Sequence, residues 1–386
     1  MKKAIVVLYA HPEAYPPTLN AMTELAGMFD RISLLFRPNM ETTWAFADNV
    51  ELQPSGPVIS VIDQGAMPLP QKMKLFLNFV RDFQRLCKKE KPEMVLLYDP
   101  LALLVYSWAK KLGLPKCKVW YHNHDVLEQN QKRFSLNWWA LKAQKEMFPK
   151  LDVFSLPAQE RKKYFPMESF KGDYFFLPNL PAVSFYRQFS TVKKDPNTFR
   201  VIFQGAIGTG HGIEEILDLM PIKINDRPLH LILKGWVRPE YKKTLLGIIE
   251  KKNLKNQVEF VGFTAYEELP ALTASCHVGI GIHAKVDIMN KTLGTASNKI
   301  YEYASVGLPV LYYDNKHFTR HLQQFNWAIP TDVSKESLIK VLEHCEANFT
   351  ELSNNARNDF LEKLNFENHF KQMGEYFLRK EKLQLA

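Results

Sequence analysis

The sequence contains few cysteines, and their spacing excludes two common kinds of structural site. The four cysteines lie far apart in the chain, without any Cys-x-x-Cys pair: Cys87, Cys117, Cys276 and Cys345. Structural zinc sites and disulfide frameworks both need closely spaced or regularly paired cysteines. The composition therefore predicts a chain without either feature, and we expect it in the reducing cytoplasm.

Long hydrophobic runs are also missing. The most apolar region, residues 94–109, is interrupted by Asp99 and Pro100 and is shorter than the roughly 20 residues that span a bilayer. Residues 4–10 form an apolar run after two lysines, but it meets His11-Pro12-Glu13 without a small-residue cleavage site. We interpret this run as a buried strand and not as a signal peptide. The sequence predicts a protein that is soluble or lies on a membrane without crossing it.

Acidic residues are outnumbered, with 41 Asp and Glu against 50 Lys and Arg and a formal net charge of +9. Such an excess favours anionic partners, namely nucleotide phosphates, nucleic acid or an acidic membrane surface. No basic run is interleaved with aromatic residues, which disfavours nucleic acid. Basic clusters at residues 88–89, 110–111 and 161–163 predict peripheral association with an anionic membrane. The alternative is that these clusters are solvated helix faces.

Apolar runs of strand length alternate with helical patterns along most of the chain. In the first half the runs are residues 4–10, 32–36, 58–62, 94–98, 119–122, 153–156 and 174–177. A second series follows at residues 200–204, 229–234, 258–261, 277–282 and 309–312. Alternation of this kind predicts an α/β fold with parallel sheets and helices on both faces. We expect two doubly wound domains, residues 1–182 and 198–365, and a C-terminal helix over residues 366–386 that packs back on the first domain.

The segment over residues 297–311 is the most informative part of the sequence. It predicts a short helix that is capped by Ser297 or Asn298, stopped by a glycine and followed at once by a strand. A helix N-terminus presents free N–H groups and the positive end of a dipole, which suit a diphosphate. Lys299 adds a positive charge, and Glu302, three residues later, lies on the same side as an acceptor for ribose hydroxyls. The segment therefore predicts a nucleotide-sugar site.

Three further strand ends in the second half carry residues that suit a nucleotide. Gly205 opens a glycine-rich turn that contains His211, and glycine allows the backbone to approach phosphate closely. The turn is not a Walker sequence, because no Gly-Lys-Ser/Thr follows. Lys234 ends a second strand, where its amine can reach a phosphate, and the alternative is a solvated lysine. Thr264 follows a third strand, in a loop whose backbone can hold the edge of a nucleobase, and the alternative is an ordinary turn. A long polar loop before Ser297, of a kind often functional, contains Lys285, Asp287, Asn290 and Lys291.

Polar residues also follow strands in the first half. His124 and Asp125 close the strand that begins near residue 119, and His11 and Glu13 close the first strand. Ligands of doubly wound folds bind at the carboxyl ends of the strands. In the segment that ends the strand near residue 119, two histidines and an aspartate, His122, His124 and Asp125, invite a metal interpretation, but no further ligand at motif spacing is visible. We interpret the cluster as part of a substrate site, with a simple cap as the alternative.

Taken in order, these segments resemble the GT-B glycosyltransferases, in particular the retaining group 1 enzymes related to glycogen synthase and to bacterial polysaccharide or lipid-glycan transferases. The likeness covers most of the chain from about residue 120 onward. The matching segments are His124-Asp125, Asp152-Val153, Leu177-Pro178-Asn179, Phe203-Gln204-Gly205 with residues 212–215, Lys234-Gly235, residues 258–262 with Glu268-Leu269, and residues 298–303 with residues 307–310.

The resemblance implies two Rossmann-like domains that face each other across an active-site cleft, with the donor nucleotide held mainly by the second. It implies that Glu302 binds the donor ribose and that Gly205 and the following loop lie under the diphosphate. Asn298 and Lys299 match a variant of many bacterial members, and His124 matches a residue beside the transferred sugar. No metal or other cofactor is expected, because basic side chains and helix N-termini neutralise the leaving diphosphate of the nucleotide-sugar co-substrate.

Three features of the sequence depart from the family pattern. Gly294 stands where retaining members often carry a second glutamate, and His11-Pro12-Glu13 replaces the usual paired glycines after the first strand. Ala206 and His211 replace the usual arginine and lysine of the phosphate loop. Phosphate neutralisation is therefore expected to move to other basic residues, namely Lys234, Arg238, Lys291 or Lys299.

The favoured function is transfer of a hexosyl group, with retention, from a nucleotide diphosphosugar to a glycan, lipid-linked or small-molecule acceptor in polysaccharide or glycoconjugate biosynthesis. We expect His124 and Asp125 at the reacting sugar and His11 and Glu13 on the acceptor side. The donor residues would be Gly205, His211, Lys234, Thr264, Asn298, Lys299 and Glu302. One alternative is a sugar-nucleotide epimerase of the same fold, with Glu13 and Asp125 as acid and base. Another is a catalytically inactive partner protein, which Ala206 and Gly294 favour.

Overall fold

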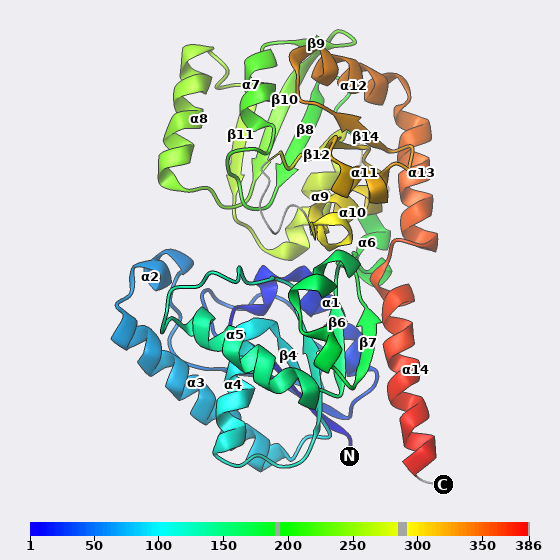
Figure 1. The fold of residues 1–386 in the computed structure, drawn as a ribbon. Helices are drawn as coiled ribbons and strands as arrows, with labels where there is room; N and C mark the ends of the chain where they lie inside the picture. Colours follow the sequence, from blue (N-terminus) through cyan, green and yellow to red (C-terminus); the bar gives the residue numbers. More distant parts are fainter. Residues whose placement is uncertain (190–193, 285–291, 385–386) are drawn as a thin grey trace. The chain divides into compact units, whose positions relative to one another are not determined.

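The computed structural model describes residues 1–189, 194–284 and 292–384 of the chain. The chain divides into two compact units, of which the first contains Met1–Pro178 and His369–Ala386 and the second Asn179–Asn368. Each unit is built on a parallel sheet, so the predicted α/β class with two doubly wound units is confirmed (Figure 1). The division falls after Pro178, so the stretch between the two predicted domains belongs to the second unit.

The sheet of the first unit has seven strands in the order β3-β2-β1-β4-β5-β6-β7, all paired in parallel. The central strands are almost wholly buried and therefore appear in the sequence as continuous apolar runs. The strands are β1 (Lys3–Leu8), β2 (Arg31–Phe36), β3 (Val50–Pro54), β4 (Met94–Tyr98), β5 (Lys118–His122), β6 (Val153–Leu156) and β7 (Asp173–Phe176). From β1 the chain first adds strands on one side, β2 and β3, and then returns to add β4 on the other side of β1. The carboxyl ends of β1 and β4 therefore form a topological switch point.

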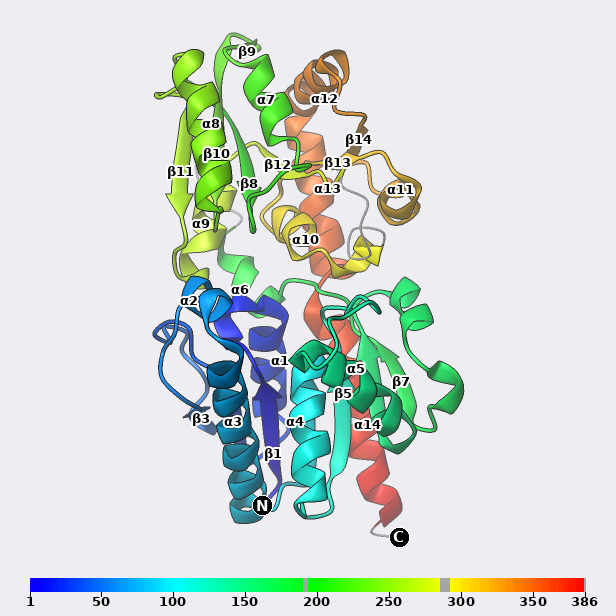
Figure 2. The ribbon, with the colours of Figure 1, turned by 60° about the vertical axis from the view of Figure 1, so that its left-hand side comes forward.

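Helices cover both faces of this sheet. They are α1 (Pro16–Ala26), α2 (Val61–Ala66), α3 (Leu69–Glu90), α4 (Asp99–Lys111), α5 (Leu136–Met147) and the greater part of α14 (Phe366–Gln384). Helices α3 and α4 lie together in front of the sheet in Figure 2, with α14 behind it. Two phenylalanines of α14, Phe370 and Phe377, pack on Trp120 of β5 with ring centroids 6.1 and 6.0 Å away.

The strand predicted over residues 58–62 is wrong. Those residues lead into helix α2, whose N-cap Ser60 accepts a hydrogen bond from the Asp63 N–H (3.1 Å). The third strand is instead β3, which lies at the sheet edge and is only partly buried. Its alternating sequence Val-Glu-Leu-Gln-Pro contains no apolar run, which is why the sequence pattern did not reveal it.

The second unit has six parallel strands in the order β11-β10-β8-β12-β13-β14, and β9 pairs antiparallel with β10. The strands are β8 (Phe199–Gln204), β9 (Lys223–Ile224), β10 (Arg227–Lys234), β11 (Val258–Gly262), β12 (Val278–Gly281), β13 (Val310–Tyr313) and β14 (Ala328–Thr331). The chain runs outward from β8 to β11 and then returns to β12 on the other side of β8. The switch point of this unit therefore lies between the carboxyl ends of β8 and β12.

The helices of the second unit again lie on both faces of the sheet (Figure 2). They are α6 (Val183–Tyr186), α7 (Ile213–Leu219), α8 (Pro239–Lys251), α9 (Leu269–Ala274), α10 (Asn298–Ser305), α11 (Lys316–Leu322), α12 (Lys335–Ala347) and α13 (Phe349–Glu362). Helices α7, α8 and α12 bury one face of β8 and β10 in an aliphatic core. On the other face the Tyr303 ring of α10 lies against Gly279 of β12, where a Cβ would approach the ring to 2.3 Å.

Candidate functional site

The switch point of the second unit brings the end of β8 together with the start of α10. Lys299, in the first turn of α10, places its amine 4.1 Å from the centre of the Phe203 ring and beside Gly205. A Cβ on Gly205 would lie 3.5 Å from that amine, so the lysine is directed at the glycine turn. Burial lowers the pKa of Lys299 to about 7, which Glu302 partly opposes. The amine is therefore poised to gain its full charge when an anion binds.

Glu302 is almost completely buried and is held by two side chains from different elements. Gln204 Nε2 donates to Glu302 Oε2 (2.6 Å), and the Tyr266 hydroxyl donates to Oε1 (3.0 Å). Tyr266 in turn shares a hydrogen bond with the Tyr186 hydroxyl (2.9 Å), and Gln204 Oε1 accepts from Thr273 (3.0 Å). Burial raises the pKa of Glu302, while the hydrogen bonds from Tyr266 and Gln204 oppose that rise. The result is a carboxylate of fixed orientation at the strand end.

Polar atoms without partners gather at the same switch point. His283, which follows β12, is buried, and neither ring nitrogen has a hydrogen-bond partner within the described residues. Its ring meets the ring of His211 edge-on at 4.8 Å, and burial holds its pKa well below the usual range. Asn298 Oδ1 is likewise buried without a partner in that part of the chain. Buried polar atoms normally find partners, so a polar ligand would satisfy groups that the protein leaves open.

Neighbouring strand ends extend this surface. The Gly205 N–H donates to the Lys234 carbonyl, and the Gly235 N–H donates to the Gly262 carbonyl (both 2.9 Å). Gly235 lies so close to the β8 turn, with φ at +131°, that a Cβ there would meet the Gly205 oxygen at 2.0 Å. The Lys234 amine reaches the Gly262 carbonyl (3.0 Å), and burial lowers its pKa. Thr264 lies two residues further on, and its hydroxyl donates to the Ala265 carbonyl (3.3 Å).

The structure shows the contacts of the residues that depart from the family pattern. Gly294 faces His321, and a Cβ at position 294 would lie 2.8 Å from the imidazole, so a glutamate does not fit in this arrangement. Ala206 is exposed, and His211 Nδ1 lies 3.1 Å from the Ile282 carbonyl. Lys291 and the polar loop residues Lys285, Asp287 and Asn290 lie outside the described residues.

In the first unit, His124 is the centre of a second polar cluster. Its ring stacks on Tyr98 with centroids 5.0 Å apart and an interplanar angle of 7°, and on Tyr15 at 5.5 Å. Tyr15 also directs its hydroxyl to Asp125 Oδ2 (3.4 Å). Buried Arg161 donates to the His124 carbonyl. The imidazole is thus held between two rings at the carboxyl edge of the sheet, next to the switch point between β1 and β4.

Asp99, which the sequence did not single out, organises this cluster. Its Oδ1 accepts the backbone N–H groups of His124 (2.7 Å) and Asp125 (3.1 Å), and its Oδ2 lies 3.6 Å from His124 Nδ1. Asp99 adopts a left-handed backbone conformation with φ at +68°, which a non-glycine residue adopts at a cost. In the sequence, this position shows only an Asp-Pro pair after a buried strand, which does not indicate a left-handed turn.

His11 and Glu13 are buried inside the first unit. Both carboxylate oxygens of Glu13 are engaged, by the Thr43 N–H (2.8 Å), the Thr43 hydroxyl (2.7 Å) and the Trp44 N–H (3.2 Å). His11 lies edge-on to Phe36, and burial lowers its pKa. The contacts of Glu13 hold the turn that precedes Tyr15, and the acceptor role of His11 and Glu13 stays a prediction.

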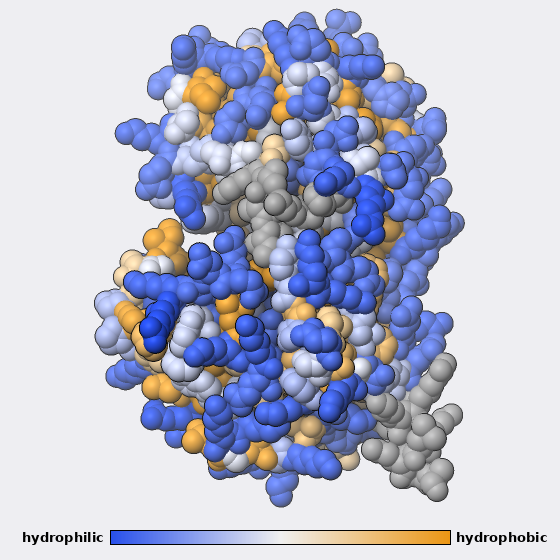
Figure 3. Space-filling view, viewed as in Figure 1, coloured by the Kyte–Doolittle hydropathy of each residue, from blue (hydrophilic) through white to orange (hydrophobic). Residues whose placement is uncertain are grey.

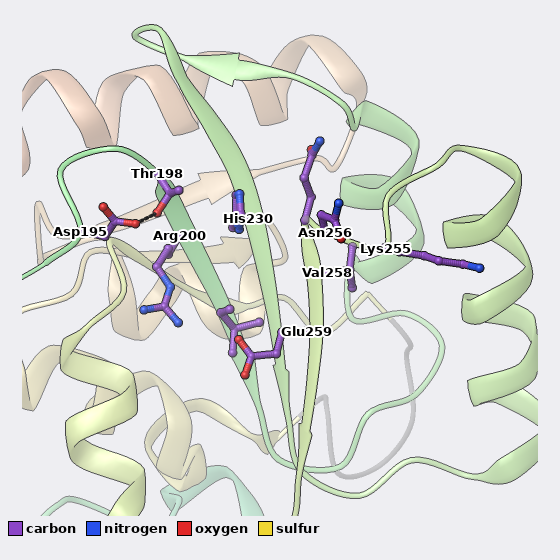
Figure 4. Close-up of a pocket in the computed structure, with 10 residues that line it drawn as sticks. Asp195, Thr198, Arg200, His230, Lys255, Asn256, Val258 and Glu259 are labelled. Carbon is purple, nitrogen blue, oxygen red and sulfur yellow. Dashed lines mark hydrogen bonds between the residues drawn. The ribbon is translucent and has the colours of Figure 1, made fainter.

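A surface hollow of about 390 Å³ lies at the other end of the second sheet (Figure 4). It is near the amino ends of β8 and β11 and is lined by groups of both signs, among them Asp195, Arg200, His230 and Glu259. The Thr198 hydroxyl donates to Asp195 (2.7 Å). Because the predicted donor residues all follow the carboxyl ends of strands, this hollow is separate from them.

The described residues lack two features, a membrane-spanning helix and a metal cluster. None of their helices is both long and apolar enough to cross a membrane. Within the same residues, no group of three or more His, Cys, Asp or Glu side chains is arranged to hold a metal ion.

Comparison with known proteins finds one family match and several similar structures. Residues 185–359 match the family model described as Glycosyl transferases group 1. No curated protein sequence matches the chain. A sucrose-phosphate synthase from Thermosynechococcus elongatus has a similar structure, with 14% identity, all of both chains covered and a TM-score of 0.70.

Two other solved structures are informative. HepE from Anabaena, in complex with UDP and glucose, is 16% identical over 98% of this chain and 100% of its own, with a TM-score of 0.68. A Listeria monocytogenes protein assigned as a UDP-N-acetylglucosamine 2-epimerase is 12% identical over 100% of this chain and 97% of its own, with a TM-score of 0.60. Residues 185–359 are therefore similar to the group 1 glycosyltransferases, and the whole chain has the GT-B fold.

Proposed function

We propose that the protein is a hexosyltransferase that uses a nucleotide diphosphosugar, with a uridine diphosphate donor as the first candidate. The observation that carries the proposal is the joint position of Lys299 and Glu302 beside the Gly205 turn at the switch point of the second unit. The similarity to HepE, which was solved with UDP and glucose, supports the choice of base.

The donor is held by groups of opposite character. Glu302 accepts the ribose hydroxyls, and the start of α10, Lys299 and Lys234 face the diphosphate. His283 and His211 add imidazole donors at the end of β12 and in the β8 turn, where the family pattern has an arginine and a lysine. Backbone N–H and C=O groups of the loop around Thr264 hydrogen-bond the edge of the nucleobase. This division leaves the phosphates neutralised by lysines and N–H groups without a metal ion.

Catalysis in this proposal is electrostatic. The bond between the anomeric carbon and the diphosphate oxygen breaks, and the developing negative charge stays with the diphosphate. The acceptor oxygen forms the new bond to the anomeric carbon, and its proton passes to the departing diphosphate. His124 and Asp125 contact the transferred sugar, and the tight packing of His124 between two tyrosines fixes its position. We propose retention of the anomeric configuration, and a glycan, lipid-linked or small-molecule acceptor of polysaccharide or glycoconjugate biosynthesis in the cytoplasm.

The first test is a thermal-shift screen of UDP, GDP and ADP, followed by calorimetry with the best ligand. Binding of one nucleoside diphosphate in chelator, with much weaker binding of its nucleoside, is the expected result. Transfer is then measured with the matching sugar donors, and the anomeric configuration of the product is read by NMR. Failure to bind any of the three diphosphates would support the alternative of a catalytically inactive partner protein.

The epimerase alternative is tested by incubating the donor without acceptor. Only an epimerase changes the configuration of the sugar under those conditions. The structure disfavours Glu13 as its acid or base, because both oxygens already accept hydrogen bonds from Thr43 and Trp44. A transferase instead returns the donor unchanged or slowly hydrolysed.

A further inference from the structure

The basic clusters of the first unit do not form one cationic face. Lys88 and Lys89 end α3, and Lys110 and Lys111 end α4, so they lie toward the amino ends of the strands and complement the helix dipoles. Arg161 is buried and bonded to the His124 carbonyl at the opposite edge of the sheet. A membrane contact that rests on these clusters therefore has no continuous surface to use.

A different surface of the same unit is strongly apolar. Val58, Val61, Ile62 and Leu69 are 58%, 61%, 60% and 55% exposed, and they fall within one short stretch around α2. No residue of α2 is buried. Figure 3 shows hydrophobic side chains over α2 as an orange patch on the surface. We call these four residues the α2 patch.

The chemistry of the α2 patch identifies its partner. Protein interfaces are anchored mainly by aromatic residues and arginine, with Leu and Val under-represented, whereas the patch is wholly aliphatic. The carboxylate of α2, Asp63, already accepts the Ser60 hydroxyl (2.6 Å). Lys72 and Lys74 follow in the first turns of α3. The Lys72 amine donates to the Gly65 carbonyl at the end of α2 (3.0 Å), and neither lysine has a carboxylate partner within the described residues. Aliphatic side chains next to lysines match the boundary between acyl chains and anionic headgroups.

We propose that the α2 patch inserts into the surface of an anionic lipid bilayer, with Lys72 and Lys74 at the headgroups. The patch follows β3 and precedes α3, so it lies at the carboxyl edge of the first sheet, which is also the edge that carries His124. A bilayer bound there delivers a lipid-linked acceptor to the edge of the sheet where the reacting sugar is proposed to lie.

The experiment measures co-sedimentation of the full chain with vesicles of phosphatidylcholine alone and of phosphatidylcholine mixed with phosphatidylglycerol. The wild-type protein is expected to pellet with the mixed vesicles at low salt. The double variant Val61→Asp/Ile62→Asp should lower the partition coefficient about tenfold or more. Leu112→Asp is the matched control, because Leu112 is equally exposed, at 58%, but lies after the end of α4. Lys72→Gln/Lys74→Gln should cost about fivefold per lysine on anionic vesicles only.

Three results overturn the proposal: no pelleting of the wild type, equal pelleting of Val61→Asp/Ile62→Asp and the wild type, or equal losses in this variant and in Leu112→Asp. A concentration-dependent dimer in light scattering that the Val61→Asp/Ile62→Asp change abolishes, without pelleting, assigns the patch to a second copy instead. UDP affinity and melting temperature are recorded for every variant to show that it is folded. Because pelleting needs no nucleotide, its failure is distinct from a failure of the proposed activity.

Discussion

Glu302 shows how its surroundings change what a single carboxylate can do. A buried carboxylate without partners would be protonated at neutral pH, but Gln204 and Tyr266 donate to its two oxygens and favour the charged form. Each carboxylate oxygen has a second lone pair, so both oxygens can still accept a ribose hydroxyl. The network from Tyr186 to Thr273 therefore sets the orientation of the carboxylate before the nucleotide arrives.

Replacing Glu302 by alanine should weaken UDP binding by about 1–3 kcal/mol, the scale of a hydrogen bond to a charged group. The loss should be much smaller for 2′-deoxy-UDP, which already lacks one of the hydroxyls. Tyr266→Phe should show the same selective loss at lower magnitude. Glu259→Gln, an exposed change on β11, is the control. Equal losses of affinity for UDP and for its deoxy analogue in calorimetry would contradict the assignment of Glu302 to the ribose.

Lys299 makes UDP binding depend on pH. Because burial lowers its pKa to about 7, the amine loses its proton in the free protein as pH rises above 7, whereas a bound diphosphate stabilises the charged form. Affinity for UDP should therefore fall between pH 7 and 9, and binding should take up a proton, which calorimetry in buffers of different ionisation enthalpy detects. Lys299→Arg, which stays charged, should flatten this dependence. Lys299→Ala should weaken UDP far more than uridine; equal losses count against a phosphate role.

His124→Ala should reduce the rate of transfer while UDP affinity stays within about twofold, because its cluster belongs to the first unit. Asp99→Asn keeps the shape but weakens the hold on the two backbone N–H groups and on the imidazole, so a smaller loss in the same parameter is expected. Activity should survive a strong chelator. Activity that a chelator abolishes and one divalent cation restores would show that a metal participates.

The sequence alone located the residues whose spacing is local. Lys299 and Glu302 are three positions apart on one helix, so their common side followed from helix geometry. Tyr266, Gln204 and His283 come from three other segments and reach the same strand ends only through the sheet order. Asp99 needs knowledge of a left-handed turn that its residue type does not indicate. Long-range pairing therefore limited what could be predicted at the site.

At the scale of elements, prediction succeeded for strands that contain an apolar run. The central strands β1, β4 and β8 are mostly apolar and appeared as runs, and so did the edge strands β7 and β11, although both are only partly buried. The edge strands β3 and β14 contain no such run and were not predicted. Helix α10 ends as predicted, with Gly307 in the left-handed conformation and the Leu308 N–H bonded to the Tyr303 carbonyl (2.9 Å). Helix α2 was not predicted because none of its residues is buried, so its sequence lacks the apolar periodicity of a helix that packs on a core.

The close approach of two strand ends gives a prediction at this scale. Gly235→Ala places a Cβ 2.0 Å from the Gly205 oxygen at a positive φ, so the β8 and β10 turns must separate. We expect a loss of several kcal/mol in stability, on the order of other strained substitutions, together with a loss of UDP binding. Gly247→Ala is the matched control, since nothing lies within 4 Å of its Cβ in helix α8. It should raise stability by about 0.5–1 kcal/mol; equal melting temperatures of the two variants would contradict the steric argument.

At the scale of the whole molecule, α14 links the end of the chain to the beginning. The helix starts in the second unit, but from His369 onward it belongs to the first, where Phe370 is 1% exposed against the Trp120 ring. Its phenylalanines bury a face of β5 that would otherwise meet water. The first unit therefore requires residues from both ends of the sequence for its stability, although the second unit lies between them in the chain.

Phe370→Ala should lower the stability of the first unit by about 3–5 kcal/mol, the usual range for a buried phenylalanine. Hydrogen exchange followed by mass spectrometry resolves the units: peptides from β5 should exchange faster, while peptides from β10 keep the wild-type rate. UDP affinity should also be retained, because the predicted donor residues belong to the second unit. Lys371→Ala, at an exposed position on the same helix, is the control and should leave both sets of peptides unchanged. Equal acceleration in β5 and β10 would mean that the two units unfold together, and that α14 stabilises the chain as one cooperative body.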